Sequence, residues 1–161
     1  MKLYDSRQLG PLVFRDPLLL CSALYFLLYF DASGFLRLGL LAAFLHECGH
    51  ILVYYALLRR FPVIEVTMTG FCMRMDAPAR ALSPGRLFWL AAAGPAVNFM
   101  LAGIWALRLE QSMTIRGSAF WAANLLTGGF NLLPVPPLDG AQLAACLCEM
   151  QRAGKKFRGN D

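Results

Sequence analysis

Two histidines and a glutamate in the run His46-Glu47-Cys48-Gly49-His50 are the residues whose types and spacing best suit chemistry in this chain. His-Glu-x-x-His on a helix is typical of zinc-dependent hydrolytic sites. Histidines four residues apart project from the same helix face and can share one metal ion. Glu47 directly follows the first histidine and is placed to activate a water molecule at that metal. The pattern therefore predicts His46 and His50 as metal ligands and Glu47 as the catalytic base.

A catalytic zinc ion needs a third protein ligand, because such sites combine three ligands with one open position. The chain has only two histidines, so the third ligand must be a carboxylate or a cysteine. Most of the other acids lie in or beside polar flanks, in the hairpin described below or before the basic tail: Asp5, Asp16, Asp31, Glu65, Asp76, Glu110, Glu149 and Asp161. Asp139 differs, because it follows a proline-rich break inside an apolar segment. We predict Asp139 as the third ligand of one Zn²⁺ per chain; the alternative, an N-cap of the last helix, is compatible with that role.

The composition indicates an integral membrane protein. Of the 161 residues, 58% are hydrophobic and only 16% are charged, whereas a soluble domain averages about 25% charged residues. The net charge of +5 suggests nucleic acid at first sight, but the basic residues cluster at the ends of apolar segments, as membrane topology requires. We therefore expect a lipid bilayer and no nucleic-acid partner. Residues 1–161 are expected to form a single domain with no removable signal peptide and no separate regulatory domain.

Four apolar segments and one alternating segment define the expected fold. The apolar segments cover Pro17 to Phe30, about 34 to 58, about 82 to 107, and a last one that begins near 117, breaks at 128–137 and resumes from about 139 to 153. The alternation of residues 61–75 predicts a short β-hairpin. The predicted fold class is an all-α integral membrane protein with about four transmembrane segments, a hairpin between the second and third, and a broken fourth helix. The first segment is short enough to be partial or interfacial instead.

The distribution of basic residues predicts the orientation. With four crossings, twelve of the fifteen lysines and arginines fall on the side that holds both termini and the loop at 59–86. The positive-inside rule places that side in the cytoplasm. His50 lies nine residues before Arg59, or ~13 Å along a helix. The site is therefore expected within the membrane, towards the cytoplasmic side.

Three motifs in this order make the chain resemble the site-2 proteases, a family of intramembrane zinc metalloproteases. The first is His46-Glu47-Cys48-Gly49-His50. The second, Gly94-Pro95-Ala96-Val97-Asn98, is similar to the family's Gly-Pro-x-x-Asn signature. The third matches its Asn-x-x-Pro-x-Pro-x-Leu-Asp-Gly signature and reads Asn131-Leu132-Leu133-Pro134-Val135-Pro136-Pro137-Leu138-Asp139-Gly140. The resemblance covers roughly residues 34–150 and looks closest to compact bacterial members similar to the sporulation protease that processes a pro-sigma factor.

The resemblance implies a function and a set of site residues. His46, His50 and Asp139 would bind zinc, and Glu47 would be the base in cleaving a peptide bond in or near the transmembrane segment of a membrane-bound substrate. That substrate would be a single-pass protein or a membrane-associated transcription regulator, with a membrane regulatory partner possible. A weaker assignment gives Asn131, and with it Asn98, contact with the substrate carbonyl or oxyanion. The alternatives are a catalytically silent membrane scaffold and a metal-binding relative such as a transporter.

Overall fold

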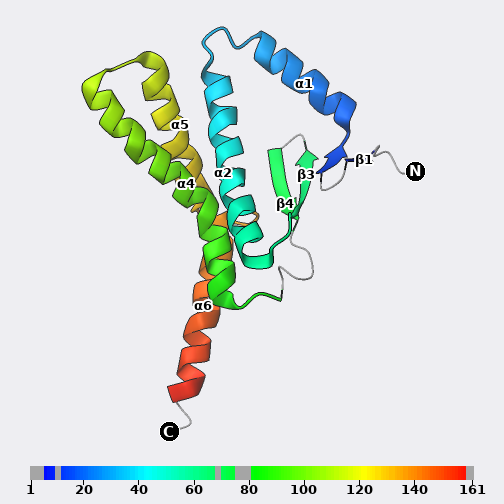
Figure 1. Cartoon of the computed structure of the whole chain (residues 1–161), viewed down its shortest axis with the longest axis vertical. Coiled ribbons are helices and arrows are strands. Elements are labelled where there is room, and N and C mark those ends of the chain that lie inside the picture. The colour runs from blue at the N-terminus through cyan, green and yellow to red at the C-terminus, as the bar shows by residue number, and fades with distance from the viewer. Residues whose placement is uncertain (1–5, 10–11, 68–69, 75–80, 159–161) are drawn as a thin grey trace.

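A computed structural model describes residues 6–9, 12–67, 70–74 and 81–158 of the chain. The elements in chain order are β1 (Ser6–Leu9), β2 (Leu12–Arg15), α1 (Pro17–Tyr29), α2 (Phe35–Leu58), β3 (Val63–Thr67), β4 (Gly70–Arg74), α4 (Pro84–Gln111), α5 (Ile115–Asn131) and α6 (Asp139–Arg158). Helices α2, α4, α5 and α6 pack together, the sheet flanks α2, and α6 extends away from the other elements towards the C-terminus (Figure 1). The helices lie where the apolar segments predicted them.

Two of the four predicted spans are long and apolar enough to cross a membrane. These are α2 with 24 residues and α4 with 28 residues. Helix α1 has 13 residues and rises ~20 Å, which is short of a hydrocarbon core ~30 Å thick. Helix α5 has 17 residues, and the loop at 132–138 separates it from α6, so the broken fourth segment is present as predicted.

The predicted hairpin is present but belongs to a larger sheet. Strands β3 and β4 pair antiparallel, with Glu65 opposite Cys72, and an ion pair of 3.4 Å joins Glu65 to Arg74. Met75, the last residue of the predicted hairpin, lies outside the described residues. Strands β1 and β2 were not predicted; β2 pairs parallel to β3, which gives the strand order β1-β2-β3-β4. The all-α assignment is corrected accordingly: the chain is mostly helical with a four-stranded sheet.

Helices α2 and α4 pack closely because small residues line their contact. A Cβ atom added at Gly49 would lie 2.6 Å from the backbone oxygen of Ala93, so only glycine permits this approach of the two backbones. Towards one end of the contact, the fully buried Tyr54 packs with Leu90, and Met73 of β4 joins them. This contact fixes the distance between the faces of α2 and α4.

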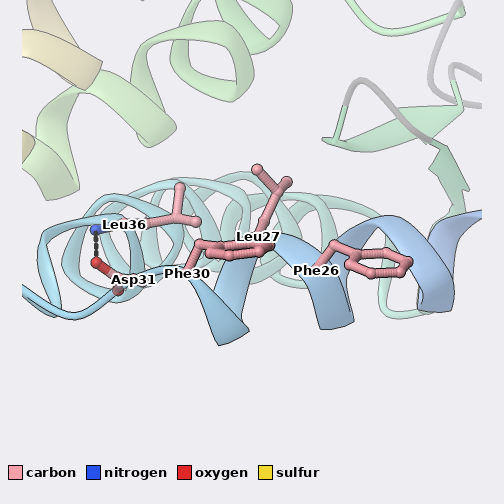
Figure 2. A pocket seen from close by; sticks show the side chains of 5 residues that line it. All are labelled: Phe26, Leu27, Phe30, Asp31 and Leu36. Carbon is pink, nitrogen blue, oxygen red and sulfur yellow. Dashed lines mark hydrogen bonds between the residues drawn. The ribbon is translucent and has the colours of Figure 1, made fainter.

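A buried carboxylate orders the start of α2. Asp31 accepts hydrogen bonds from the backbone N–H groups of Leu36 and Arg37 and from the Ser33 hydroxyl. It also lines a shallow hollow formed by Phe26, Leu27, Phe30 and Leu36 (Figure 2). Burial raises the pKa of Asp31, but these hydrogen bonds outweigh it and hold the pKa below the ordinary value of 3.8. Asp31 thus satisfies helix donors that would otherwise lack partners.

The proline-rich break is folded tightly against the first turn of α6. A Cβ atom added at Gly140 would overlap the backbone oxygen of Leu132 and lie 2.5 Å from that of Leu133. The N–H groups of Leu138 and Ala141 donate to backbone oxygens within the same segment. Glycine at 140 therefore allows the loop to fold back and to present Asp139 at the beginning of α6.

Candidate metal centre

Three side chains from two helices converge on one point. His46 and His50 project from the same face of α2, and Asp139 is the first residue of α6. Oδ2 of Asp139 lies 2.9 Å from Nε2 of His46 and 3.3 Å from Nε2 of His50, and the two Nε2 atoms are 3.1 Å apart. Both histidines are nearly inaccessible to solvent. The three predicted ligands are therefore brought together within the reach of one ion.

The second nitrogen of each histidine fixes the tautomer. Nδ1 of His50 lies 2.8 Å from the backbone oxygen of Leu90, which only accepts hydrogen bonds, so this Nδ1 carries the proton. Nδ1 of His46 lies 2.6 Å from Oδ1 of Asn98. The Asn98 amide is oriented by its own NH₂ group, which donates to the backbone oxygen of Ala42, so Nδ1 of His46 also donates. In its neutral form, each imidazole therefore directs the lone pair of Nε2 towards Asp139.

This arrangement suits a cation. With both imidazoles neutral, the two Nε2 atoms and the Asp139 carboxylate oxygen are all acceptors, and acceptors cannot satisfy one another. Two imidazole nitrogens and one carboxylate oxygen form a ligand set used by catalytic zinc, which leaves a fourth position for water or substrate. Ligating histidines that donate their other N–H to a carbonyl oxygen are typical of such sites. The residues present therefore fit a zinc ion.

Gly94 of α4 lies directly against the two imidazoles. A Cβ atom at this position would overlap Nε2 of His50 and lie 2.5 Å from Nε2 of His46. Leu90, Gly94 and Asn98 are spaced four residues apart on one face of α4, and the ligand-bearing face of α2 lies against it. The Gly-Pro-x-x-Asn motif therefore supplies both the space and one of the hydrogen-bond acceptors for the histidines.

The remaining predicted site residues lie in different surroundings. Glu47 is half-buried next to His46 on α2. Asn131 ends α5, and its amide donates to the backbone oxygen of Thr127 in the same helix, 2.9 Å away. Asn98 is fully buried, and its polar atoms bind His46, Ala42 and Asn124; its contact with substrate stays a prediction.

Two groups that hold the site in place were not predicted from the sequence. The backbone oxygen of Leu90 binds His50, and no residue type can signal a backbone acceptor in advance. Asn124 of α5 contacts Asn98. The sequence could have indicated this residue, because Asn124 is a polar residue within an apolar helix, where such residues are costly and usually have a role.

Comparison with known proteins finds relatives whose names refer to zinc metalloproteases and site-2 proteases. No family model matches the chain. It is 35% identical over 130 residues to the protein named "Putative zinc metalloprotease Rip3" of Mycobacterium tuberculosis, in strains H37Rv and Erdman alike; the alignment covers 76% of this chain and 32% of the relative. Its fold matches the solved site-2 protease of Methanocaldococcus jannaschii with a TM-score of 0.65 and 19% identity, over 91% of this chain and 72% of that one.

The chain therefore has the fold of a solved site-2 protease and resembles a protein named as a putative zinc metalloprotease. The three motifs that resemble the site-2 protease signatures are the segments that build the metal centre: His46 and His50 from the first, Gly94 and Asn98 from the second, and Asp139 from the third. The chain spans about a third of the length of the curated relatives that it matches.

Proposed function

We propose that the chain is a site-2 protease, an intramembrane zinc metalloprotease that hydrolyses a peptide bond in or near the transmembrane segment of a membrane-bound substrate. The observation that carries the proposal is the convergence of three acceptor atoms from His46, His50 and Asp139, with Glu47 adjacent on α2. The same set of residues would be unnecessary in a scaffold that only binds helices.

The exposed side chains support placement in a bilayer. Large apolar residues are exposed along α1, α2, α4 and α5; among those at least half exposed are Leu18, Leu52, Trp89, Leu107, Leu126 and Phe130, and Phe30 directly after α1. Monomeric soluble proteins rarely expose apolar surface on this scale, whereas lipid covers it at no cost. We propose a cell-membrane protein of bacterial type with both termini in the cytoplasm. Four crossings would then include the α5–α6 segment and α1, whose 13 helical residues span the core only together with the residues that flank them.

The chemistry follows from the donor and acceptor pattern of the site. A zinc ion bound there would supply Lewis acidity and lower the pKa of a water molecule towards ~7. The Glu47 carboxylate would accept the proton of the attacking water and deliver it to the nitrogen of the leaving amine. The imidazoles of His46 and His50 are held in place from behind by Asn98 and Leu90, so they need not reorient during the reaction. Asn131 remains our candidate for contact with the substrate carbonyl.

A transmembrane helix must unwind before its peptide bonds can be attacked. Strand β4 ends the sheet and contacts α2, the helix that bears Glu47. We propose that the substrate adds to β4 as an extended strand, because strand addition uses the unpaired main-chain groups of a sheet edge. In a complex of the Glu47→Gln variant with an uncleaved substrate, backbone amides of β4 are expected to exchange hydrogen more slowly than in the free variant. Unchanged exchange in β4 would exclude strand addition there.

The substrate class that we propose is a single-pass membrane protein or a membrane-associated transcription regulator, with a further membrane protein as regulator. Peptide cleavage by the purified chain in lipid vesicles provides the test. Cleavage is expected to stop when a chelator removes the metal and to return when Zn²⁺ is added, because the attacking water is activated only at a bound cation. Cleavage that continues after complete metal removal, or a zinc-loaded chain that cleaves none of a panel of membrane substrates, would contradict the proposed activity.

A further inference from the structure

Asn124 is a fully buried polar residue that the proposed chemistry does not use. It lies on α5, whereas the zinc-binding residues lie on α2 and α6. Its Oδ1 accepts a hydrogen bond of 3.0 Å from Nδ2 of Asn98, and its Nδ2 donates to the backbone oxygen of Phe120 at 2.9 Å. Burying an amide is costly unless it is fully hydrogen-bonded. Asn124 therefore belongs to a satisfied network rather than to generic packing.

This network determines which way the Asn98 amide faces. Nδ2 of Asn98 has two hydrogens, and it donates one to the backbone oxygen of Ala42 and the other to Oδ1 of Asn124. A flipped amide would place its oxygen against these two acceptors. Asn124 itself cannot turn without losing its bond to the backbone oxygen of Phe120. Oδ1 of Asn98 is thus directed towards Nδ1 of His46, 2.6 Å away.

The orientation of the Asn98 amide determines whether Nε2 of His46 can bind a metal. When Asn98 presents its oxygen, His46 carries its proton on Nδ1 and keeps the lone pair on Nε2 for a metal. If Asn98 presented its NH₂ group, the proton would move to Nε2 and His46 could not ligate through that atom. We propose that Asn124 is a positioning residue, which holds His46 through Asn98 in the tautomer that binds zinc. This inference rests on the proposed zinc site.

The test compares substitutions at Asn124 by their effect on metal retention. Asn124→Leu keeps a side chain with four heavy atoms branched at Cγ but removes the acceptor, whereas Asn124→Asp keeps an oxygen that accepts from Asn98. We expect Asn124→Leu to lose zinc to a competing chelator about 10-fold faster than the unaltered protein, the lower end of what altered partners of a metal ligand cost. Asn124→Asp is expected to restore most of the retention. The same order should appear in the visible spectrum of the cobalt-substituted protein, which reports ligand geometry.

A packing control separates this role from general destabilisation of α5. Phe120 is buried on the same helix one turn away and packs on Trp105, and its side chain takes no part in the amide network. Phe120→Leu is expected to lower thermal stability and to leave the zinc off-rate and the cobalt spectrum unchanged. If Asn124→Leu and Phe120→Leu lose zinc equally at equal loss of stability, Asn124 has no positioning role. Zinc binding by the unaltered protein is measured alongside. If the unaltered protein binds no zinc, the proposed function fails, whereas the role of Asn124 is tested only by the difference between the variants.

Discussion

Replacing Gly94 with alanine is expected to weaken zinc binding strongly while leaving the helix that carries it intact. The added methyl group would overlap Nε2 of His50 and lie 2.5 Å from Nε2 of His46, the atoms proposed to hold the ion. The imidazoles cannot move aside cheaply, because Leu90 and Asn98 bind their other nitrogens. We expect the affinity for zinc to fall at least about 100-fold, the upper end of the loss seen when the surroundings of a metal ligand change. Equilibrium titration with zinc in a chelator buffer measures it.

Gly103 provides the matched control. It lies on α4 as well, and a Cβ atom there would meet no heavy atom within 4 Å. Both substitutions replace a helical glycine with alanine, which favours the helix by roughly 1 kcal/mol. Gly103→Ala is therefore expected to bind zinc as the unaltered protein does and to be at least as stable. Equal zinc affinity in the two variants would show that the close contact of Gly94 with the histidines is unimportant.

Replacing Glu47 with glutamine is expected to remove catalysis without removing the metal. The amide has nearly the same size as the carboxylate but cannot accept the proton of the attacking water. General base catalysis contributes about 10²–10⁴-fold, so the single-turnover rate of cleavage in vesicles should fall by about this factor. Zinc content should remain that of the unaltered protein, because Glu47 is not among the three converging side chains.

Cys48→Ala serves as the control within the same motif. Cys48 follows Glu47 on α2 and is half-buried like it, and we assign it no part in the chemistry. Its variant is expected to cleave within a few-fold of the unaltered rate. Cleavage that persists in Glu47→Gln would overturn the role of Glu47 as the base, and loss of zinc in that variant would mean that the carboxylate is a ligand instead.

The sequence allowed the ligand set to be predicted because local spacing and composition carry that information. Two histidines four residues apart must share a helix face, and Asp139 was the only acid that followed a break inside an apolar segment. Helix positions followed from the apolar runs, and the proline-rich segment marked the boundary between α5 and α6. The structure brings His46, His50 and Asp139 together as these arguments predicted.

What the sequence did not reveal depends on contacts between distant segments. The pairing of β2 with β3 joins residues about fifty positions apart, and four-residue strands carry too little alternation to be predicted alone. Gly94 could be read as a packing residue, but its contact with both imidazoles depends on how closely α2 and α4 approach. Asn98 could be read either as a packing residue or as a contact for substrate, and its bonds to His46 and Asn124 could not be foreseen because they join residues of three different helices.

X-ray absorption at the zinc edge of the purified, unaltered protein tests the central claim most directly. The account predicts one zinc ion per chain, bound to two imidazole nitrogens and to oxygen at about 2.0–2.2 Å, with no sulfur ligand. Loss of the imidazole signal in His46→Ala would assign it to this site. A protein purified without bound zinc and unable to take it up, or a zinc–sulfur distance of about 2.3 Å from a cysteine ligand, would contradict a centre built from His46, His50 and Asp139.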